Sequence, residues 1–231
     1  MKRFWKTAAP KAVTDGWIVH LDGRPIKTQR GAPQVVPTEA LAGAMAAEWE
    51  RQGEEIDPAD FRFRDLADYA IDVIAADRAA AIHRILAFAE SDTLCYRAEP
   101  DEPLAARQRA VWEPLLKTAE VNRGLRFERV AGVVHRAQPE ATLATLKDTL
   151  QGLDDFTLAA LQTLASLAAS LVVGLAALEP GADAEALFAA ANLEEDWQAE
   201  QWSWDHEAEA RRARRLAEFA AAARFAALVR D

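Results

Sequence analysis

The sequence predicts an α+β fold, in which a small N-terminal antiparallel β-rich domain precedes a larger, mainly α-helical domain. Up to about residue 60, short strand-like segments alternate with turns, whereas apolar residues at helical spacing dominate the rest of the chain. With 231 residues and 51% apolar content, the chain can bury a core as one large domain or two modest ones. We place the boundary near residue 75, which gives domains 1–75 and 76–231.

Residues 16–28, GWIVHLDGRPIKT, have the pattern of a complete β-hairpin. Apolar and mixed positions alternate from Trp17 to Leu21, and Asp22-Gly23 supplies a turn in which glycine adopts a positive φ without steric cost. Pro25 cannot donate a ladder hydrogen bond, so the returning strand is expected at a sheet edge. Further short strands are expected at residues 4–6 and 34–36.

A helix is predicted from Thr38 to about Gly53, because Thr38 follows Pro37 and can act as an N-cap. Its buried side is expected to carry Ala40, Leu41, Ala44, Met45 and Trp49. Two strand-like segments, 93–97 and 125–135, could join the N-terminal sheet or form a separate hairpin. Further helices are predicted over 66–88 (as two helices), 103–121, 141–150, 155–178, 184–191 and 193–230.

Residues 156–178 contain no charged side chain and are long enough to span a bilayer. We interpret them instead as a buried helix, because Gln, Thr and Ser dilute the hydrophobicity and no Lys or Arg flanks the segment. Ser166, Ser170 and Gly174 form a small-residue stripe that another helix could approach closely. No stable membrane insertion is therefore expected.

Composition excludes some classes of protein. The formal net charge of -10 disfavours nucleic-acid binding, which needs a basic face. A lone cysteine, Cys95, rules out an intramolecular disulfide and is expected to be a small buried hydrophobe in a strand. The N-terminus resembles neither a signal peptide nor a transit peptide. We expect a bacterial cytoplasmic protein, or a mitochondrial matrix protein if the chain is a processed eukaryotic form.

Enzymatic signatures are scarce. The histidines lack ligand spacing such as HExxH, and neither a glycine-rich phosphate loop nor a G-x-S-x-G elbow occurs. Asp65, Asp68 and Asp72 share a helical face, but without a matching base or metal ligand they are interpreted as a solvated stripe. We expect no catalytic residue, no metal site and no cofactor.

The C-terminal region shows a charge gradient. Seven acids and no Lys or Arg occur between Glu194 and Glu209, and four arginines follow directly. Most of these charges are interpreted as a solvated helix, supported by pairs such as Glu207 with Arg211 and Glu209 with Arg212. A functional interpretation applies to Glu200 and Asp205, because acids among exposed indoles are typical of protein interfaces, although core packing also explains the tryptophans. The predicted partner-binding residues are Glu200, Asp205, Trp202 and Trp204.

Several short motifs are spread over nearly the whole chain. They are Arg3-Phe4-Trp5, the hairpin, Pro37-Thr38, Glu48-Trp49, DTLCYRA at 92–98, Trp112-Glu113-Pro114-Leu115-Leu116, LDDFTLAAL at 153–161, and Glu200-Gln201-Trp202 with Asp205. In their order and spacing these motifs together resemble the family of ATP synthase assembly chaperones that bind the alpha subunit. Near the C-terminus this chain has Trp202-Ser203-Trp204-Asp205 where that family is expected to have Trp-Gly before the acid.

The resemblance implies an ATP-independent chaperone that binds the unassembled alpha subunit and prevents its aggregation until it pairs with beta. It also implies that acids near the C-terminus matter for function, and Glu200 and Asp205 are the positions that fit. The alternative is a small enzyme with an acidic pair in an interdomain cleft and an unknown substrate. A pocket holding two perturbed carboxylates would favour the enzyme, and a broad apolar surface near Trp202 would favour the chaperone.

Overall fold

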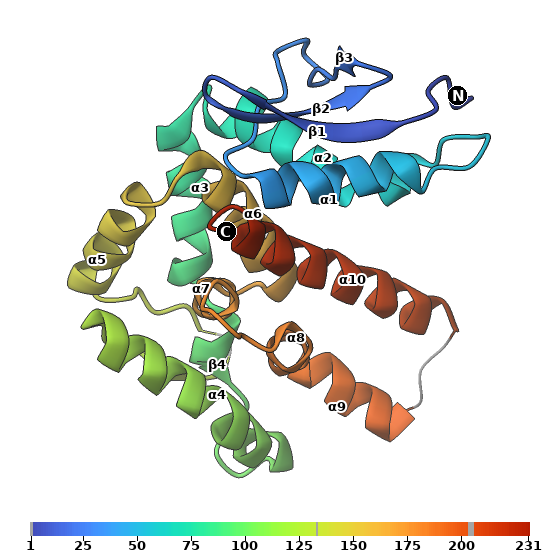
Figure 1. The fold of residues 1–231 in the computed structure, drawn as a ribbon. Coiled ribbons are helices and arrows are strands. Elements are labelled where there is room, and N and C mark those ends of the chain that lie inside the picture. The colour runs from blue at the N-terminus through green and yellow to red at the C-terminus, as the bar shows by residue number, and fades with distance from the viewer. Residues whose placement is uncertain (1, 133, 203–205) are drawn as a thin grey trace. The chain divides into compact units, whose positions relative to one another are not determined.

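The structure is a computed structural model that describes residues 2–132, 134–202 and 206–231 (Figure 1). It confirms the predicted α+β class, because a three-stranded antiparallel sheet precedes a mostly helical region. The chain forms two compact units. Unit 1 contains Met1–Arg78, Asp154–Ala160 and Ala221–Asp231, and unit 2 contains Ala79–Leu153 and Leu161–Ala220. The predicted domains 1–75 and 76–231 stay a prediction.

The sheet of unit 1 has the order β1-β2-β3, with β1 at Ala8–Val13, β2 at Gly16–Leu21 and β3 at Arg24–Pro25. Asp22 and Gly23 have φ values of 48° and 81°, so the predicted hairpin turn is confirmed. Two other strand predictions are wrong. Residues 4–6 form no strand, and 34–36 contribute only a bridge between Trp17 and Val36. Strand β1 was not predicted, because its residues, AAPKAV, include few strand formers.

Helix α1 (Glu39–Glu50) begins as predicted, since the Thr38 side chain accepts a hydrogen bond from the Leu41 N–H at 3.1 Å. Leu41, Met45 and Trp49 are buried as expected, whereas Ala40 is exposed. After a short 3-10 turn (Pro58–Asp60), α2 (Arg62–Tyr69) continues into the π-helical turn η2 (Ala70–Ile74).

Two segments from the second half of the chain complete unit 1. They are the first residues of α6 (Asp155–Ala168) and the last residues of α10 (His206–Leu228). The Phe225 ring lies 6.3 Å from the Phe63 ring and 6.4 Å from the Phe156 ring, and the Thr38 hydroxyl donates to the Leu228 carbonyl at 2.5 Å. The core of unit 1 therefore depends on residues more than a hundred positions apart.

Unit 2 is mainly helical and holds a small second sheet. Strands β4 (Tyr96–Arg97) and β5 (Val130–Ala131) pair in parallel, so they neither extend the first sheet nor form the predicted hairpin alternative. Cys95 is buried as expected, but it ends a 3-10 turn, η3 (Thr93–Cys95), rather than lying in a strand. The helices are α3 (Arg78–Glu90), α4 (Pro103–Arg123), α5 (Glu140–Gln151), α7 (Leu171–Ala177), α8 (Ala184–Ala191) and α9 (Leu193–Trp202), with the remaining parts of α6 and α10.

The predicted single helix over 155–178 is wrong. Ala169 takes a positive φ of 47°, and the Ser170 side chain caps a new helix, α7, by accepting from the Val173 N–H at 3.1 Å. Gly174 permits a close helix contact, since a Cβ there would lie 3.0 Å from Leu161 and 3.2 Å from the Ala165 nitrogen. Of the predicted small-residue stripe, only Gly174 is seen to approach α6, because Ser166 is exposed and Ser170 caps α7. In the described part of the chain, no helix is both long and apolar enough to cross a membrane.

Candidate partner-binding surface

Glu200, the one predicted site residue whose side chain the structure describes, is exposed near the end of α9. Its carboxylate forms a bidentate ion pair with Arg107 of α4, with N–O distances of 2.5 and 2.7 Å. These hydrogen bonds from Arg107 lower the pKa of Glu200 below its ordinary value. The pair gives the Glu200 carboxylate a defined position on the surface of unit 2.

The same arginine contacts Trp197, which is half-buried. The Arg107 guanidinium lies 5.3 Å from the centre of the Trp197 ring, within the range of a cation–π contact. Arg107 therefore links an indole and a carboxylate on α9. This arrangement places an ordered negative charge beside an aromatic side chain.

Other acids of α9 bind neighbouring helices. Asp196 forms a bidentate pair with Arg212 of α10, at 2.7 and 2.5 Å, and Glu195 pairs with Arg215 at 3.3 Å. We predicted that Arg212 supports its own helix through Glu209, and the structure corrects this by giving Arg212 a partner on another helix. Most of the acidic run of α9 thus has a structural role in unit 2.

The remaining predicted site residues cannot be placed by their side chains. Trp204 and Asp205 lie outside the described residues, and Trp202 ends α9 with only its backbone described. The role of Arg107 was not predicted, because Arg107 is 93 positions from Glu200 and no local sequence pattern indicates that the two side chains pair.

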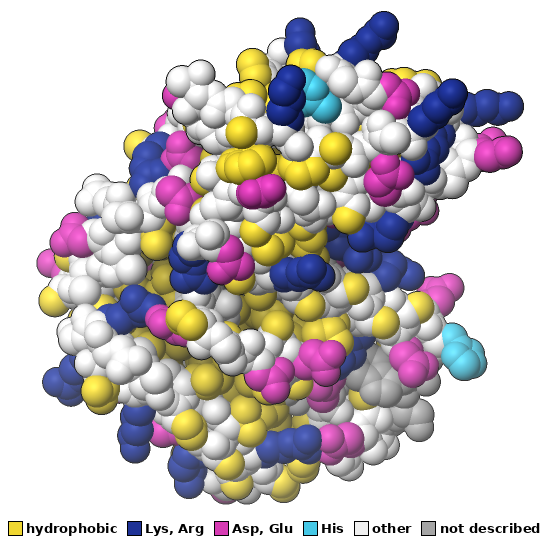
Figure 2. Space-filling model, viewed as in Figure 1, with side chains coloured by type: hydrophobic (Ala, Val, Ile, Leu, Met, Phe, Trp, Pro, Cys, Tyr) yellow, Lys and Arg dark blue, Asp and Glu magenta, His cyan; other side chains and the backbone are white. Residues whose placement is uncertain are grey.

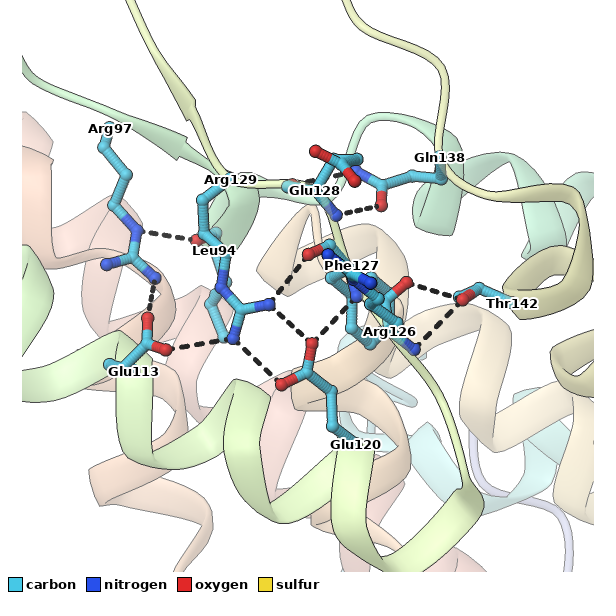
Figure 3. A network of polar contacts seen from close by, with 10 residues as sticks. All are labelled: Leu94, Arg97, Glu113, Glu120, Arg126, Phe127, Glu128, Arg129, Gln138 and Thr142. Atoms are coloured by element: carbon cyan, nitrogen blue, oxygen red, sulfur yellow. Dashed lines mark hydrogen bonds and ion pairs between the residues drawn. The ribbon is translucent and has the colours of Figure 1, made fainter.

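A polar network anchors β4 and β5 to α4 (Figure 3). Arg129 bonds to both Glu113, at 3.0 Å, and Glu120, while Arg97 bonds to the other oxygen of Glu113 at 3.1 Å. The hydrogen bond from Arg129 lowers the pKa of Glu120, and Arg129 has its pKa raised by the same contact. Arg97 and Arg129 thus each bind a carboxylate of α4, and these ion pairs hold β4 and the residue before β5 to that helix.

A pocket of about 220 Å³ is lined by residues of unit 1 alone. The enzyme alternative, by contrast, required an acidic pair in a cleft between the two domains. Of the stripe predicted to be solvated, Asp65 is exposed and Asp72 half-buried, but Asp68 is only 6% exposed, and burial raises its pKa. The Asp68 carboxylate accepts from the Gln34 side chain, and Asp72 accepts from the Thr28 hydroxyl at 2.8 Å. These carboxylates fasten residues 28–34 to α2 and η2. The pocket is lined by Gln29, Arg30, Asp65, Asp68, Tyr69, Asp72 and Val73.

Comparisons with known proteins identify the class. The family model described as ATP12 chaperone protein matches residues 2–120. The mitochondrial protein atp12 of Schizosaccharomyces pombe is 27% identical over 213 residues, which cover 87% of this chain and 73% of that protein. The crystal structure of Atp12 from Paracoccus denitrificans superposes with a TM-score of 0.93 at 36% identity, covering 99% of this chain and 98% of the other.

A third match is the crystal structure of an Agrobacterium tumefaciens protein described as a candidate chaperone, with a TM-score of 0.93 and 41% identity over 97% of this chain and 85% of that one. The fold is therefore that of an assembly chaperone. The chain belongs to the ATP12 chaperone protein family, and the membership predicted from its motifs is confirmed. Its function is that of an assembly chaperone for ATP synthase.

Proposed function

We propose that this chaperone binds the unassembled alpha subunit of the ATP synthase catalytic head and shields the surface that later meets beta. A free subunit exposes an apolar interface, which promotes aggregation until its partner arrives. The chaperone needs only to bind the unassembled form, because beta can displace it by competing for overlapping surface. Neither ATP nor a catalytic step is required, so the proposed mechanism is binding alone.

The proposed contact surface consists of Glu200, Trp202, Trp204 and Asp205. The observation that supports it is the Glu200 carboxylate, which is exposed yet fixed by Arg107 beside an indole. A charge that is already ordered costs less entropy to engage on binding. Aromatic residues with charges at their rim are also the composition that binding hot spots favour.

The first test is the double variant Glu200→Lys with Asp205→Lys. We expect it to remain folded by circular dichroism and to lose suppression of alpha-subunit aggregation, measured by light scattering. Reversing two charges in the contact surface places like charges where opposite ones are needed. Unaltered suppression would contradict the assignment of this surface.

A charge swap separates client contact from internal structure, because Glu200→Lys also breaks the pair with Arg107. The variant Arg107→Glu with Glu200→Arg restores an ion pair of reversed polarity. We expect this swap to fold and still fail to suppress aggregation. Recovery of suppression would mean that the pair only holds α9 to α4, and Glu200 would then not be a client contact.

Glu179 provides a matched control. It is exposed, lies in unit 2 and forms an ion pair with Arg123 at 2.7 Å, as Glu200 does with Arg107. We expect Glu179→Lys to suppress aggregation like the native chain. An equal loss in this control would show that any charge reversal in unit 2 is harmful.

The client is tested by purifying the tagged chaperone from its own cells and identifying the bound chains by mass spectrometry. We expect the alpha subunit without stoichiometric beta, in the compartment where the catalytic head assembles. That compartment is the bacterial cytoplasm, or the mitochondrial matrix for a eukaryotic chain. Recovery of a different subunit in place of alpha would overturn the proposal.

A further inference from the structure

The charge of the chain is distributed unevenly. Residues 1–38 contain seven Lys or Arg and two Asp or Glu, a net charge of +5, whereas the whole chain has a net charge of -10. Residues 39–231 therefore have a net charge of -15. Lys and Arg side chains, with apolar ones among them, gather over β1–β3 in Figure 2. The sheet of unit 1 is thus a basic surface on an acidic protein.

The strand register shows which residues share the solvent-facing side of this sheet. Lys11 pairs with Ile18 and Val13 with Gly16, so Lys11 and Val13 project from the same face of β1. Lys11 is exposed, and Val13 is 40% exposed, since Gly16 opposite has no side chain to cover it. His20 and Pro25 pair on the same face, and Lys27, two residues after Pro25, follows it on that face. Arg24 pairs with Leu21 on the opposite face. This face therefore combines basic and apolar side chains and has no carboxylate.

Glu50 of α1 accepts from the Ala8 N–H of β1 and pairs with Arg3, and the other two acids near the sheet, Asp15 and Asp22, lie in its turns. Asp22 is also already engaged. Its carboxylate accepts from the Thr7 N–H at 2.9 Å and from the Lys6 N–H at 3.1 Å, and these bonds lower its pKa. By contrast, among the described residues no salt bridge forms to Lys11, Arg24 or Lys27. The positive charge of the sheet is thus available to a partner.

We propose that this basic sheet surface, which comprises Lys11, Lys27 and Val13, binds the anionic headgroups of a bilayer without inserting into it. Dispersed lysines and arginines with an exposed apolar side chain suit a diffuse layer of anionic headgroups. An acidic peptide added as a further strand fits less well. Both outer strands contain a proline, Pro10 and Pro25, which lacks the N–H that strand addition needs.

The test is sedimentation with phosphatidylcholine vesicles, prepared with and without phosphatidylglycerol. We expect the native chain to pellet only with the anionic vesicles at low salt, and to be released at high salt because surface charges are then screened. The variant Lys11→Glu with Lys27→Glu should reduce partitioning by about 25-fold or more, since each basic side chain near the membrane contributes roughly a factor of five. Its fold is checked by circular dichroism.

The variant Lys117→Glu with Lys147→Glu is the control, because it reverses two exposed lysines of unit 2 and changes the net charge equally. We expect it to pellet like the native chain. Failure of the native chain to bind anionic vesicles at low salt, or an equal loss in the control, would overturn the proposal. So would native-like vesicle binding by the sheet variant. The sheet variant should still suppress alpha-subunit aggregation, and a loss of suppression without vesicle binding would assign the surface to an acidic protein instead.

Discussion

Asp92 is fully buried in unit 2, where it ties two elements together. Its carboxylate accepts from the Leu94 N–H in η3 and from the Val172 N–H in the first turn of α7, both at 3.0 Å. Burial raises the pKa of Asp92 from 3.8 to about 6, although these hydrogen bonds oppose the shift. The DTLCYRA motif thus begins with a carboxylate whose role is structural.

The raised pKa of Asp92 predicts that the free energy of unfolding depends on pH in a specific way. Between pH 3.8 and about 6 the folded chain keeps a proton on Asp92 that the unfolded chain releases, so the stabilising contribution of Asp92 falls as the pH rises. Asp92→Asn does not titrate. We expect the unfolding free energy of the native chain minus that of the variant to fall by about 3 kcal/mol across this window. Urea unfolding at a series of pH values measures it, and a constant difference would contradict the shifted pKa.

At the scale of elements, α1 controls where α2 begins. Glu48 is only 2% exposed, and its carboxylate accepts from the Phe63 N–H at 2.7 Å and the Arg64 N–H at 2.9 Å. Both N–H groups lie in the first turn of α2, where no intrahelical acceptor exists for them. The Glu48-Trp49 motif therefore combines a helix cap with a buried indole.

Replacing this cap should destabilise unit 1. We expect Glu48→Ala to lower the free energy of unfolding by about 1–3 kcal/mol, because it leaves buried N–H groups without an acceptor. Glu54→Ala, an exposed position in the same unit, should change it by about 0.5 kcal/mol at most. Denaturant unfolding compares the two variants. Equal changes in the free energy of unfolding would show that the Glu48 carboxylate does not stabilise the start of α2.

At the scale of the whole molecule, each compact unit is assembled from separate segments of the chain. Unit 1 includes 154–160 and 221–231 beside residues 1–78, and the predicted domain 1–75 ends close to the end of that 1–78 segment. Phe225 supplies a ring to Phe63, and Arg78 pairs with Asp155. Helices α6 and α10 each contribute residues to both units.

This organisation predicts the behaviour of a fragment. We expect residues 1–75 alone to show no cooperative unfolding transition, because the fragment lacks Phe156 and Phe225 and leaves Phe63 uncovered. Thermal unfolding followed by near-ultraviolet circular dichroism tests this, with the full chain as the reference. A sharp transition in the fragment would instead support a boundary near residue 75.

Local patterns in the sequence determined the elements whose causes are local. The hairpin turn at Asp22-Gly23 and the start of α1 at Thr38 were predictable because φ preferences and helix caps act within a few residues. Family membership was also predictable, since the order of many short motifs is itself specific. The candidate site was predicted only in part, because the sequence indicated Glu200 but not its ion pair with Arg107.

Tertiary structure decided the features that depend on distant residues. Ala169 adopts a positive φ that a non-glycine residue disfavours, and its carbonyl accepts from the Thr93 N–H at 3.1 Å and the Thr93 hydroxyl at 2.9 Å. Nothing within the apolar run of 156–178 indicates that break. The Arg107–Glu200 pair likewise depends on how α4 and α9 pack, because helix periodicity fixes which residues share a face but not which helix that face meets.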